Sequence, residues 1–317
     1  MEKRDYCFVR EDGLTIRGRL YAPDRRPFPV VVVGHAFGSN YRVLEHLGPL
    51  LGEKGIGSLF FDYCGGGRES VSDGAWEDMT CRTAALDMKT VVQQMDRVAG
   101  ADTANIFVMG RSLGGLVSAL VAAELPDKVR GAVLWYPALE LGEKTRSYFP
   151  DGVVTEKEFM GYTITRNYFE AVLDMDPYAE AAAYEGPVLI LHGDRDDVVP
   201  LESSLRAQRM YKDCALLVLP GAGHGFKRPH DRVGAKAAAQ FILDHMVVAE
   251  GSDPGRASES LRRETPAAQG GAEVNKGGQP KTVLTLLAGA LPRGVKAWRP
   301  YRKLRRSWYA WLKNRQH

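Results

Sequence analysis

Short apolar runs alternate with longer stretches of helical spacing over the first 248 residues, and this alternation constrains the fold most. The runs, rich in Val and Ile, lie at 29–33, 56–61, 106–109, 132–136, 188–191 and 216–219. Such runs are typical of strands buried on both faces of a parallel sheet. Segments 80–98 and 113–125 have helical spacing between them. The sequence therefore predicts a doubly wound, mostly parallel α/β sheet. Residues 14–21 predict half of an antiparallel hairpin at its edge.

The interval between the runs ending at 136 and beginning at 188 is too long for a plain crossover. A connection of that length predicts an inserted lid, at about 140–186, between the sixth and seventh strands. We expect some of its aromatic side chains to line an apolar acyl or aryl pocket and others to pack the lid itself. These aromatic residues are Phe149, Phe159, Tyr162, Tyr168 and Phe169.

The composition changes after residue 248, which predicts three segments. Residues 1–248 form the folded domain, and residues 249–280, rich in Gly, Pro, Ser and charge, read as a disordered linker. Residues 281–317 carry ten Lys or Arg and no Asp or Glu, so the rest of this +3 chain carries −7. The N-terminus has no signal-like apolar run and the four cysteines are scattered. We therefore expect a cytoplasmic protein without disulfides, metal or cofactor.

One short motif carries a nucleophile. Residues 110–114 read GRSLG and follow a predicted strand, and a predicted helix comes next. The pattern G-x-S-x-G in that context is typical of a sharp turn that lifts the serine above the sheet. An alcohol needs a base, and the base needs an orienting carboxylate. Ser112 is therefore the candidate nucleophile.

The base and the acid follow in the order that this kind of fold uses, serine, acid, histidine. His224 lies in a Gly-rich loop after the last predicted strand. The loop after the preceding strand holds Asp194, Asp196 and Asp197, of which only one can orient the imidazole. Asp196 and Asp197 both remain candidates at this point.

The oxyanion of an acyl-transfer intermediate needs amide donors. We expect these to be the backbone N–H of Leu113, directly after the nucleophile, and that of Phe37, in the loop after the first central strand. Other tempting residues fit structural roles better: His35 and His192 as hydrogen-bonding residues, and Cys64 as a pocket residue without a base beside it. Three glycines at 65–67 lack the Lys-Ser/Thr of a phosphate-binding loop.

Five blocks in order, GHAFGSN, FDYCGGGRES, GRSLGG, LHGDRDDVVP and GAGHGF, resemble α/β-hydrolases of the cinnamoyl/feruloyl esterase and dienelactone-hydrolase-like kind. The resemblance covers about residues 5–248. It implies that the aspartate of HGxxD, here Asp196, is the triad acid, that Phe37 holds the oxyanion position and that a lid follows the sixth strand. Two positions depart from the pattern: Ala36 replaces a glycine, and Arg111 replaces the His commonly found before the nucleophile.

These residues predict a serine hydrolase that cleaves a small or aryl carboxylic ester through an acyl-serine intermediate. Thioesterase, acyltransferase or peptidase activity would use the same triad, because lid and pocket shape decide between them. A hypothesis of another class is a non-catalytic, membrane-associated scaffold, although such a protein need not keep an ordered triad.

The basic tail predicts a helix from Pro300 onward with aromatic residues on one face. A helix of that kind suits an anionic membrane surface, which would place the protein at the membrane periphery. We favour a partly disordered, solvated tail, or a helix docked on the acidic body of this or another chain, over membrane association. Nucleic-acid binding is a further alternative that we do not favour.

Overall fold

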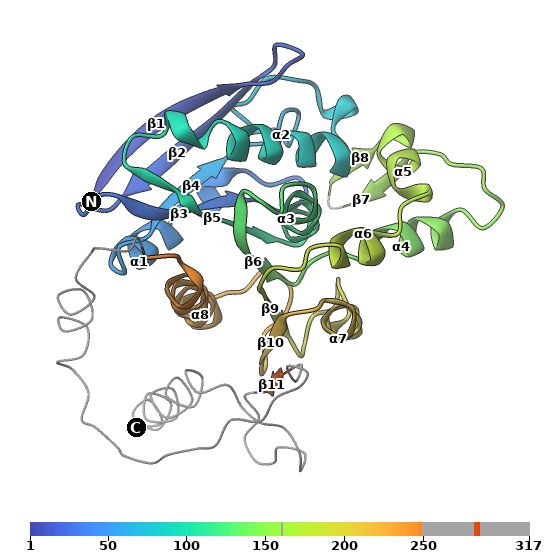
Figure 1. Cartoon of the computed structure of the whole chain (residues 1–317). Helices are drawn as coiled ribbons and strands as arrows, with labels where there is room; N and C mark the ends of the chain where they lie inside the picture. Colours follow the sequence, from blue (N-terminus) through green and yellow to red (C-terminus); the bar gives the residue numbers. More distant parts are fainter. Residues whose placement is uncertain (160, 249–281, 286–317) are drawn as a thin grey trace.

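The computed structural model describes residues 1–159, 161–248 and 282–285. Within them a nine-stranded sheet has the order β1-β2-β4-β3-β5-β6-β9-β10-β11 (Figure 1). β2 is antiparallel to both β1 and β4, and every other pair is parallel. The strands are β1 (Glu2–Val9), β2 (Thr15–Ala22), β3 (Phe28–Gly34), β4 (Gly57–Phe61), β5 (Ala101–Arg111), β6 (Val129–Trp135), β9 (Val188–Gly193), β10 (Cys214–Leu219) and β11 (Thr282–Thr285).

The predicted doubly wound, mostly parallel sheet is confirmed. All six apolar runs form strands, and β3, β4 and β9 are buried along their whole length, as expected for strands covered on both faces. The hairpin expected at 14–21 is β2, and its partner is β1. β1 itself was not predicted, because most of its residues are exposed and its pattern is charged.

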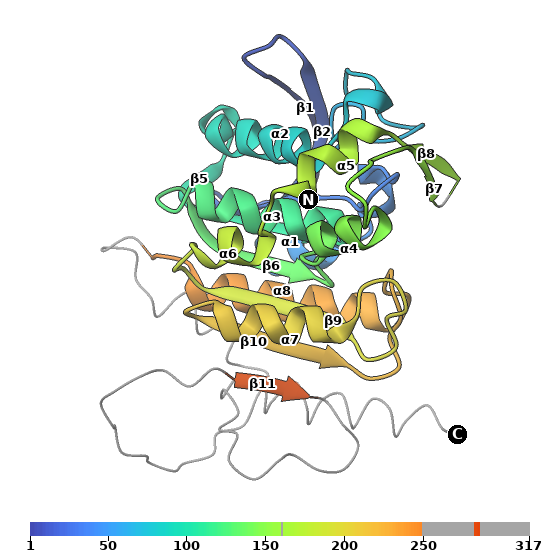
Figure 2. The same cartoon turned by 90° about the vertical axis from the view of Figure 1, so that its right-hand side faces the viewer.

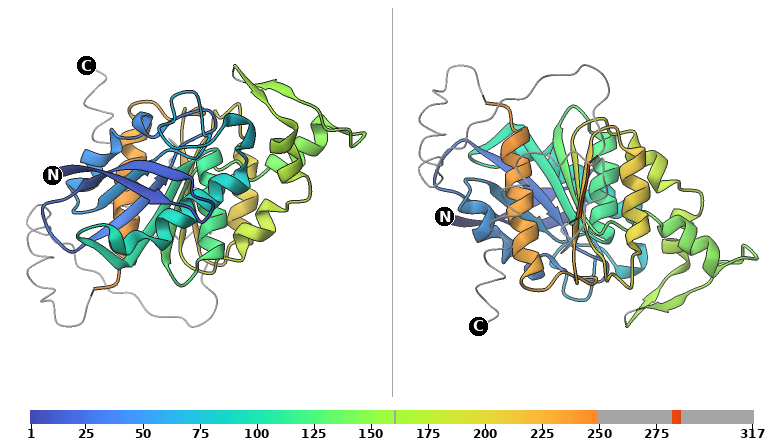
Figure 3. Two further views of the ribbon diagram at one scale, coloured as in Figure 1. Left: turned by 90° about the horizontal axis from the view of Figure 1, so that it is seen from above. Right: turned by 90° about the horizontal axis from the view of Figure 1, so that it is seen from below.

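Helices cover both faces of the sheet, as Figure 3 shows from above and below. α1 and α8 bury one face, and α2, α3 and α7 bury the other. Asn40 caps a separate 3-10 turn, and α1 begins only at Leu47. The helices of both layers are α1 (Leu47–Gly52), α2 (Cys81–Gln93), α3 (Leu113–Glu124), α7 (Leu201–Met210) and α8 (His230–His245), and 3-10 turns lie at Tyr41–Val43, Trp76–Asp78 and Met95–Arg97.

The long interval between β6 and β9 folds into an insertion of small elements. Its hairpin β7–β8 is antiparallel, and α5 lies beside α2 (Figure 2). The insertion stands where the sequence placed a lid, between the sixth and seventh strands of the large sheet. Its elements are α4 (Leu141–Tyr148), β7 (Lys157–Phe159), β8 (Tyr162–Ile164), α5 (Arg166–Leu173) and α6 (Pro177–Ala182).

The described part of the C-terminal segment is β11, which pairs in parallel with β10 at the sheet edge. An edge strand presents unpaired N–H and C=O groups, so an apolar, β-branched run can add to it. The predicted linker and the helix expected from Pro300 lie outside the described residues. None of the helices in the described part is long and apolar enough to cross a membrane.

Candidate active site

Ser112 lies at the turn between β5 and α3 in a backbone conformation that L residues rarely adopt. Its φ is 52° and its ψ is −114°. The turn is tight enough to require glycine on both sides. A Cβ on Gly110 would lie 2.0 Å from the carbonyl oxygen of Gly114, and one on Gly114 would lie 2.4 Å from that of Gly34. Strain of this kind is typical of functional positions that the surrounding structure holds in place.

The fold brings together three residues that the sequence proposed as a triad. The Ser112 hydroxyl lies 3.1 Å from Nε2 of His224. Nδ1 of the same ring lies 2.9 Å and 3.1 Å from the two carboxylate oxygens of Asp196. With the Nδ1 hydrogen directed to Asp196, Nε2 is free to accept the serine proton. The arrangement supplies a nucleophile, a base and an orienting carboxylate.

The two neighbouring carboxylates take other positions. Asp194 accepts a hydrogen bond of 2.6 Å from the amide of Gly221, which ties the acid loop to the histidine loop. Asp197 is exposed, and its carboxylate has no hydrogen-bond partner in the described residues. Of the three candidates, Asp196 is the one that contacts the imidazole.

Asp196 is held as an ionised carboxylate. Burial alone would raise the pKa of Asp196. Hydrogen bonding to His192 and His224 and to the amides of Val199 and Val198 outweighs burial and holds this pKa well below its usual range. A carboxylate that accepts several hydrogen bonds is stabilised in its charged form. The negative charge therefore persists across neutral pH and can stabilise an imidazolium on His224.

His192 supports the acid from behind. It is fully buried, its Nδ1 lies 2.6 Å from the Ser204 hydroxyl and its Nε2 lies 2.9 Å from the Val199 carbonyl. Because the carbonyl can only accept, Nε2 carries the hydrogen and Nδ1 accepts from the serine. This tautomer also directs the Nε2 hydrogen toward Asp196, 3.4 Å away.

Neither His35 nor Cys64 is among the residues that line the cavity at Ser112. Nδ1 of His35 lies 2.8 Å from the Ala36 carbonyl, and Nε2 accepts from the amide of Tyr63 at 3.3 Å. Burial lowers the pKa of His35, so the ring is neutral. Burial raises the pKa of the Cys64 thiol to about 12. A protonated thiol is a weak nucleophile at neutral pH.

The two expected oxyanion donors stand next to the serine. Leu113 is the first residue of α3, and Phe37 follows β3. Neither amide hydrogen has an acceptor within the described residues. The first amides of a helix generally lack partners inside it and favour negative charge. Phe37, Ser112 and Leu113 all line one cavity.

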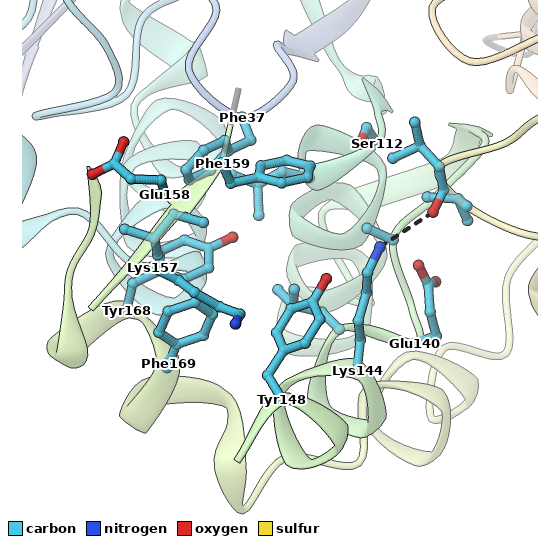
Figure 4. Close-up of a pocket in the computed structure, with 16 residues that line it drawn as sticks. Phe37, Ser112, Glu140, Lys144, Tyr148, Lys157, Glu158, Phe159, Tyr168 and Phe169 are labelled. Atoms are coloured by element: carbon cyan, nitrogen blue, oxygen red, sulfur yellow. Dashed lines mark hydrogen bonds between the residues drawn. The ribbon is translucent and has the colours of Figure 1, made fainter. Parts of the chain in front are cut away.

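The cavity beside Ser112 has a volume of about 160 Å³ and mostly apolar walls. Figure 4 shows Phe37 and Phe159 along one wall, with Tyr168, Phe169 and Tyr148 around the interior. At the other side Lys144 donates to the Val198 carbonyl at 3.3 Å. The lining residues are Phe37, Ser112, Leu113, Ala138, Glu140, Leu141, Lys144, Tyr148, Lys157, Glu158, Phe159, Ile164, Tyr168, Phe169, Val198 and Val199.

The structure divides the five aromatic residues that the sequence singled out in the insertion. Phe159, Tyr168 and Phe169 line the cavity. Phe149 packs against Phe169 instead, with ring centroids 5.0 Å apart, and Tyr162 contacts the loop that carries Phe37.

Sequence reasoning missed Tyr136, whose ring contacts that of His224. Its ring packs edge-on against His224, with centroids 4.6 Å apart, and its φ is +38°. Arg111, one of the two departures from the motif pattern, is buried and lies with its guanidinium 4.4 Å above the Trp135 ring. A tyrosine in the sequence gives no indication that its φ is positive, so no sequence signal pointed to Tyr136.

Comparison with known proteins agrees with this geometry. The profile of the prolyl oligopeptidase family matches residues 49–247, a stretch that contains Ser112, Asp196 and His224. The chain belongs to the prolyl oligopeptidase family. The match excludes the Phe37 loop, which precedes residue 49. The expected relationship to the α/β-hydrolases is thereby confirmed.

Relatives within and around the family include lipases, esterases and peptidases. A monoacylglycerol lipase of Mycolicibacterium smegmatis is 22% identical over 281 residues, covering 77% of this chain and 98% of the lipase. The uncharacterized peptidase YuxL of Bacillus subtilis is 24% identical over 268 residues, which is 71% of this chain but 36% of the peptidase. Among solved structures, Est1E from Butyrivibrio proteoclasticus with ferulic acid bound has a TM-score of 0.68 and 26% identity, covering 75% of this chain and 98% of Est1E. Family membership and these relatives identify the chain as a hydrolase.

Proposed function

We propose that this protein is a carboxylic-ester hydrolase that acts on esters of small or aryl acyl groups through an acyl-Ser112 intermediate. The observation that carries the proposal is the hydrogen-bonded series from Ser112 through His224 to Asp196, which opens into a mostly apolar cavity. Apolar walls with a few convergent polar groups are typical of small-molecule sites.

The proposed reaction has two steps, transfer of the acyl group to Ser112 and hydrolysis of the acyl-serine. His224 takes the proton of Ser112 as its oxygen bonds to the ester carbonyl carbon, and the amides of Phe37 and Leu113 stabilise the oxyanion. His224 then donates that proton to the departing alkoxide as the ester C–O bond breaks. A water molecule, deprotonated by the same imidazole, attacks the acyl-serine, and release of the acid restores the Ser112 hydroxyl.

The cavity volume favours a short acyl group. At about 160 Å³ it is smaller than the roughly 300–1,000 Å³ of sites for drug-sized ligands. Each methylene that enters an apolar wall contributes about 0.8 kcal/mol, until the cavity is full. We therefore expect kcat/KM to rise about fourfold per added methylene for the first members of an ester series and then to stop rising.

A panel of p-nitrophenyl esters from acetate to palmitate, with methyl hydroxycinnamates and peptide p-nitroanilides, tests the proposal. Short esters or hydroxycinnamates should be hydrolysed, and the anilides should not be hydrolysed above the uncatalysed rate. Cleavage of anilides but not esters would favour a peptidase. Cleavage of acyl thioesters ahead of all oxygen esters would favour a thioesterase.

A substitution that fills part of the cavity tests whether the acyl group binds there. Ala138 lines it and donates its amide to the Ser112 carbonyl at 3.1 Å. In Ala138→Leu, the three added carbons should take the space of about three methylenes, which lowers kcat/KM for hexanoate relative to acetate by up to about 60-fold. Ala104→Leu, at an exposed site on β5, is the matched control. Equal chain-length profiles for the two variants would show that the acyl group binds elsewhere.

A further inference from the structure

The loop that carries the Phe37 amide is held from outside by the inserted hairpin. Tyr162, on β8, donates its hydroxyl to the Gly38 carbonyl at 2.7 Å, across 124 positions of sequence. Gly38 has a φ of +63°, and a Cβ there would lie 2.5 Å from the Tyr162 ring. The loop and the hairpin are thus packed closely enough to exclude a side chain between them.

Two peptide planes connect this hydrogen bond to the proposed oxyanion donor. In a trans peptide the carbonyl and the following N–H point in opposite directions within one plane. The Gly38 carbonyl and the Ser39 N–H share such a plane, and that N–H donates to the Ala36 carbonyl at 3.2 Å. The Ala36 carbonyl in turn shares its plane with the Phe37 N–H. A change at the Gly38 carbonyl therefore changes the direction in which the Phe37 amide points.

The side chain of Phe37 meets the same part of the insertion. Its ring lies 6.0 Å from the Tyr162 ring and 6.1 Å from the Phe159 ring, centroid to centroid. The hairpin is fixed in turn by Trp76, whose Nε1 donates to the Thr163 carbonyl at 2.8 Å. The contacts that dock the hairpin are therefore also the contacts that hold the Phe37 loop in place.

Arg68 completes the docking. Its guanidinium lies 4.9 Å from the centre of the Tyr162 ring and donates to the Gly161 carbonyl at 2.6 Å. The Tyr162 ring is therefore held between Arg68 and Trp76, with the Trp76 and Tyr162 centroids 4.4 Å apart. Removal of the hydroxyl alone leaves these ring contacts in place.

From this geometry we infer that Tyr162 is a positioning residue for the oxyanion hole, which makes transition-state stabilisation dependent on the docked hairpin. The inference rests on the proposed function. Tyr162 does not line the cavity that holds the acyl group, so its hydroxyl acts through the loop and not through the substrate.

Tyr162→Phe tests the inference, with Tyr184→Phe as the matched control. The Tyr184 hydroxyl also donates to a backbone carbonyl, that of Val129 at 2.8 Å, outside the cavity and the Phe37 loop. Loss of an oxyanion donor itself costs about 10²- to 10³-fold in kcat. A donor that is kept but misdirected should cost less, so we expect about a tenfold loss of kcat in Tyr162→Phe with KM within about twofold. Tyr184→Phe should stay within about twofold in both.

A second readout separates positioning from packing. A trifluoromethyl ketone forms a tetrahedral adduct on serine, so its inhibition constant should worsen with kcat in Tyr162→Phe. The constant for the free carboxylic acid should not change. If both variants behave alike, or if the acid weakens as much as the ketone, Tyr162 has no positioning role.

A third readout does not need an ester substrate. The rate at which a fluorophosphonate labels Ser112 also depends on oxyanion stabilisation, and it should fall about tenfold in Tyr162→Phe. If the wild-type protein hydrolyses no ester of the panel, the proposed function fails, but this rate still decides the role of Tyr162. Melting temperatures of both variants show whether each is folded.

Discussion

Ser112→Ala should lower kcat/KM for p-nitrophenyl butyrate by about 10⁵-fold or more, to the level of the oxyanion amides and binding alone. The Ser112 oxygen is the atom 3.1 Å from Nε2 of His224, and no other hydroxyl is hydrogen-bonded to that ring in the described residues. The variant should fold, because alanine removes one oxygen and leaves the glycines of the turn in place. Circular dichroism and the melting temperature check the fold, and rate assays at high enzyme concentration measure the residual activity.

Ser147→Ala is the control for this substitution. Ser147 is exposed on α4, and its hydroxyl bonds only within its own helix, to the Lys144 carbonyl. Its activity should match that of the wild type. A folded Ser112→Ala protein with activity within tenfold of the wild type would show that hydrolysis does not pass through an acyl-Ser112 intermediate.

Asp196→Asn should lower kcat by about 10⁴-fold while KM changes little. The amide of asparagine would direct an N–H toward Nδ1 of His224, where the carboxylate now accepts at 2.9 Å. The imidazole would then carry its hydrogen on Nε2, which can no longer accept the proton of Ser112. The geometry would be nearly unchanged, so the loss would report the tautomer and the missing charge.

Asp197→Asn is the matched control, since Asp197 is exposed one residue further along the loop. Its kcat should stay within about twofold of the wild type, as is usual for a surface substitution away from the site. A loss in Asp197→Asn equal to that in Asp196→Asn would contradict the assignment of the triad acid. A loss in Asp197→Asn alone would reverse it.

The sheet could be predicted from the sequence because its signal is local. Val30 to Val33 form an unbroken apolar run, which is the sequence pattern of a strand covered on both faces. The turn at Ser112 could be predicted for a similar reason, since Gly110 and Gly114 mark the close approach that the turn needs. The strand β1 could not, because it is exposed and charged.

The details of the site depend on contacts between distant parts of the chain. Asp194, Asp196 and Asp197 are almost equivalent in sequence, and only the folded loop directs one of them at His224. The lining by Lys144 and Tyr148 depends on how the insertion packs against α2 and α3, which periodicity does not encode. The same holds for the bond between Tyr162 and Gly38, whose partners are 124 positions apart.

The measurement that tests the central claim most directly is covalent labelling by a fluorophosphonate, located by peptide mass spectrometry. The wild-type protein should carry one label, on Ser112, and His224→Ala should label far more slowly because the serine has lost its base. Prior incubation with a short p-nitrophenyl ester should slow labelling while the ester lasts. A folded wild-type protein that takes no label, or takes it on a residue other than Ser112, would contradict the account.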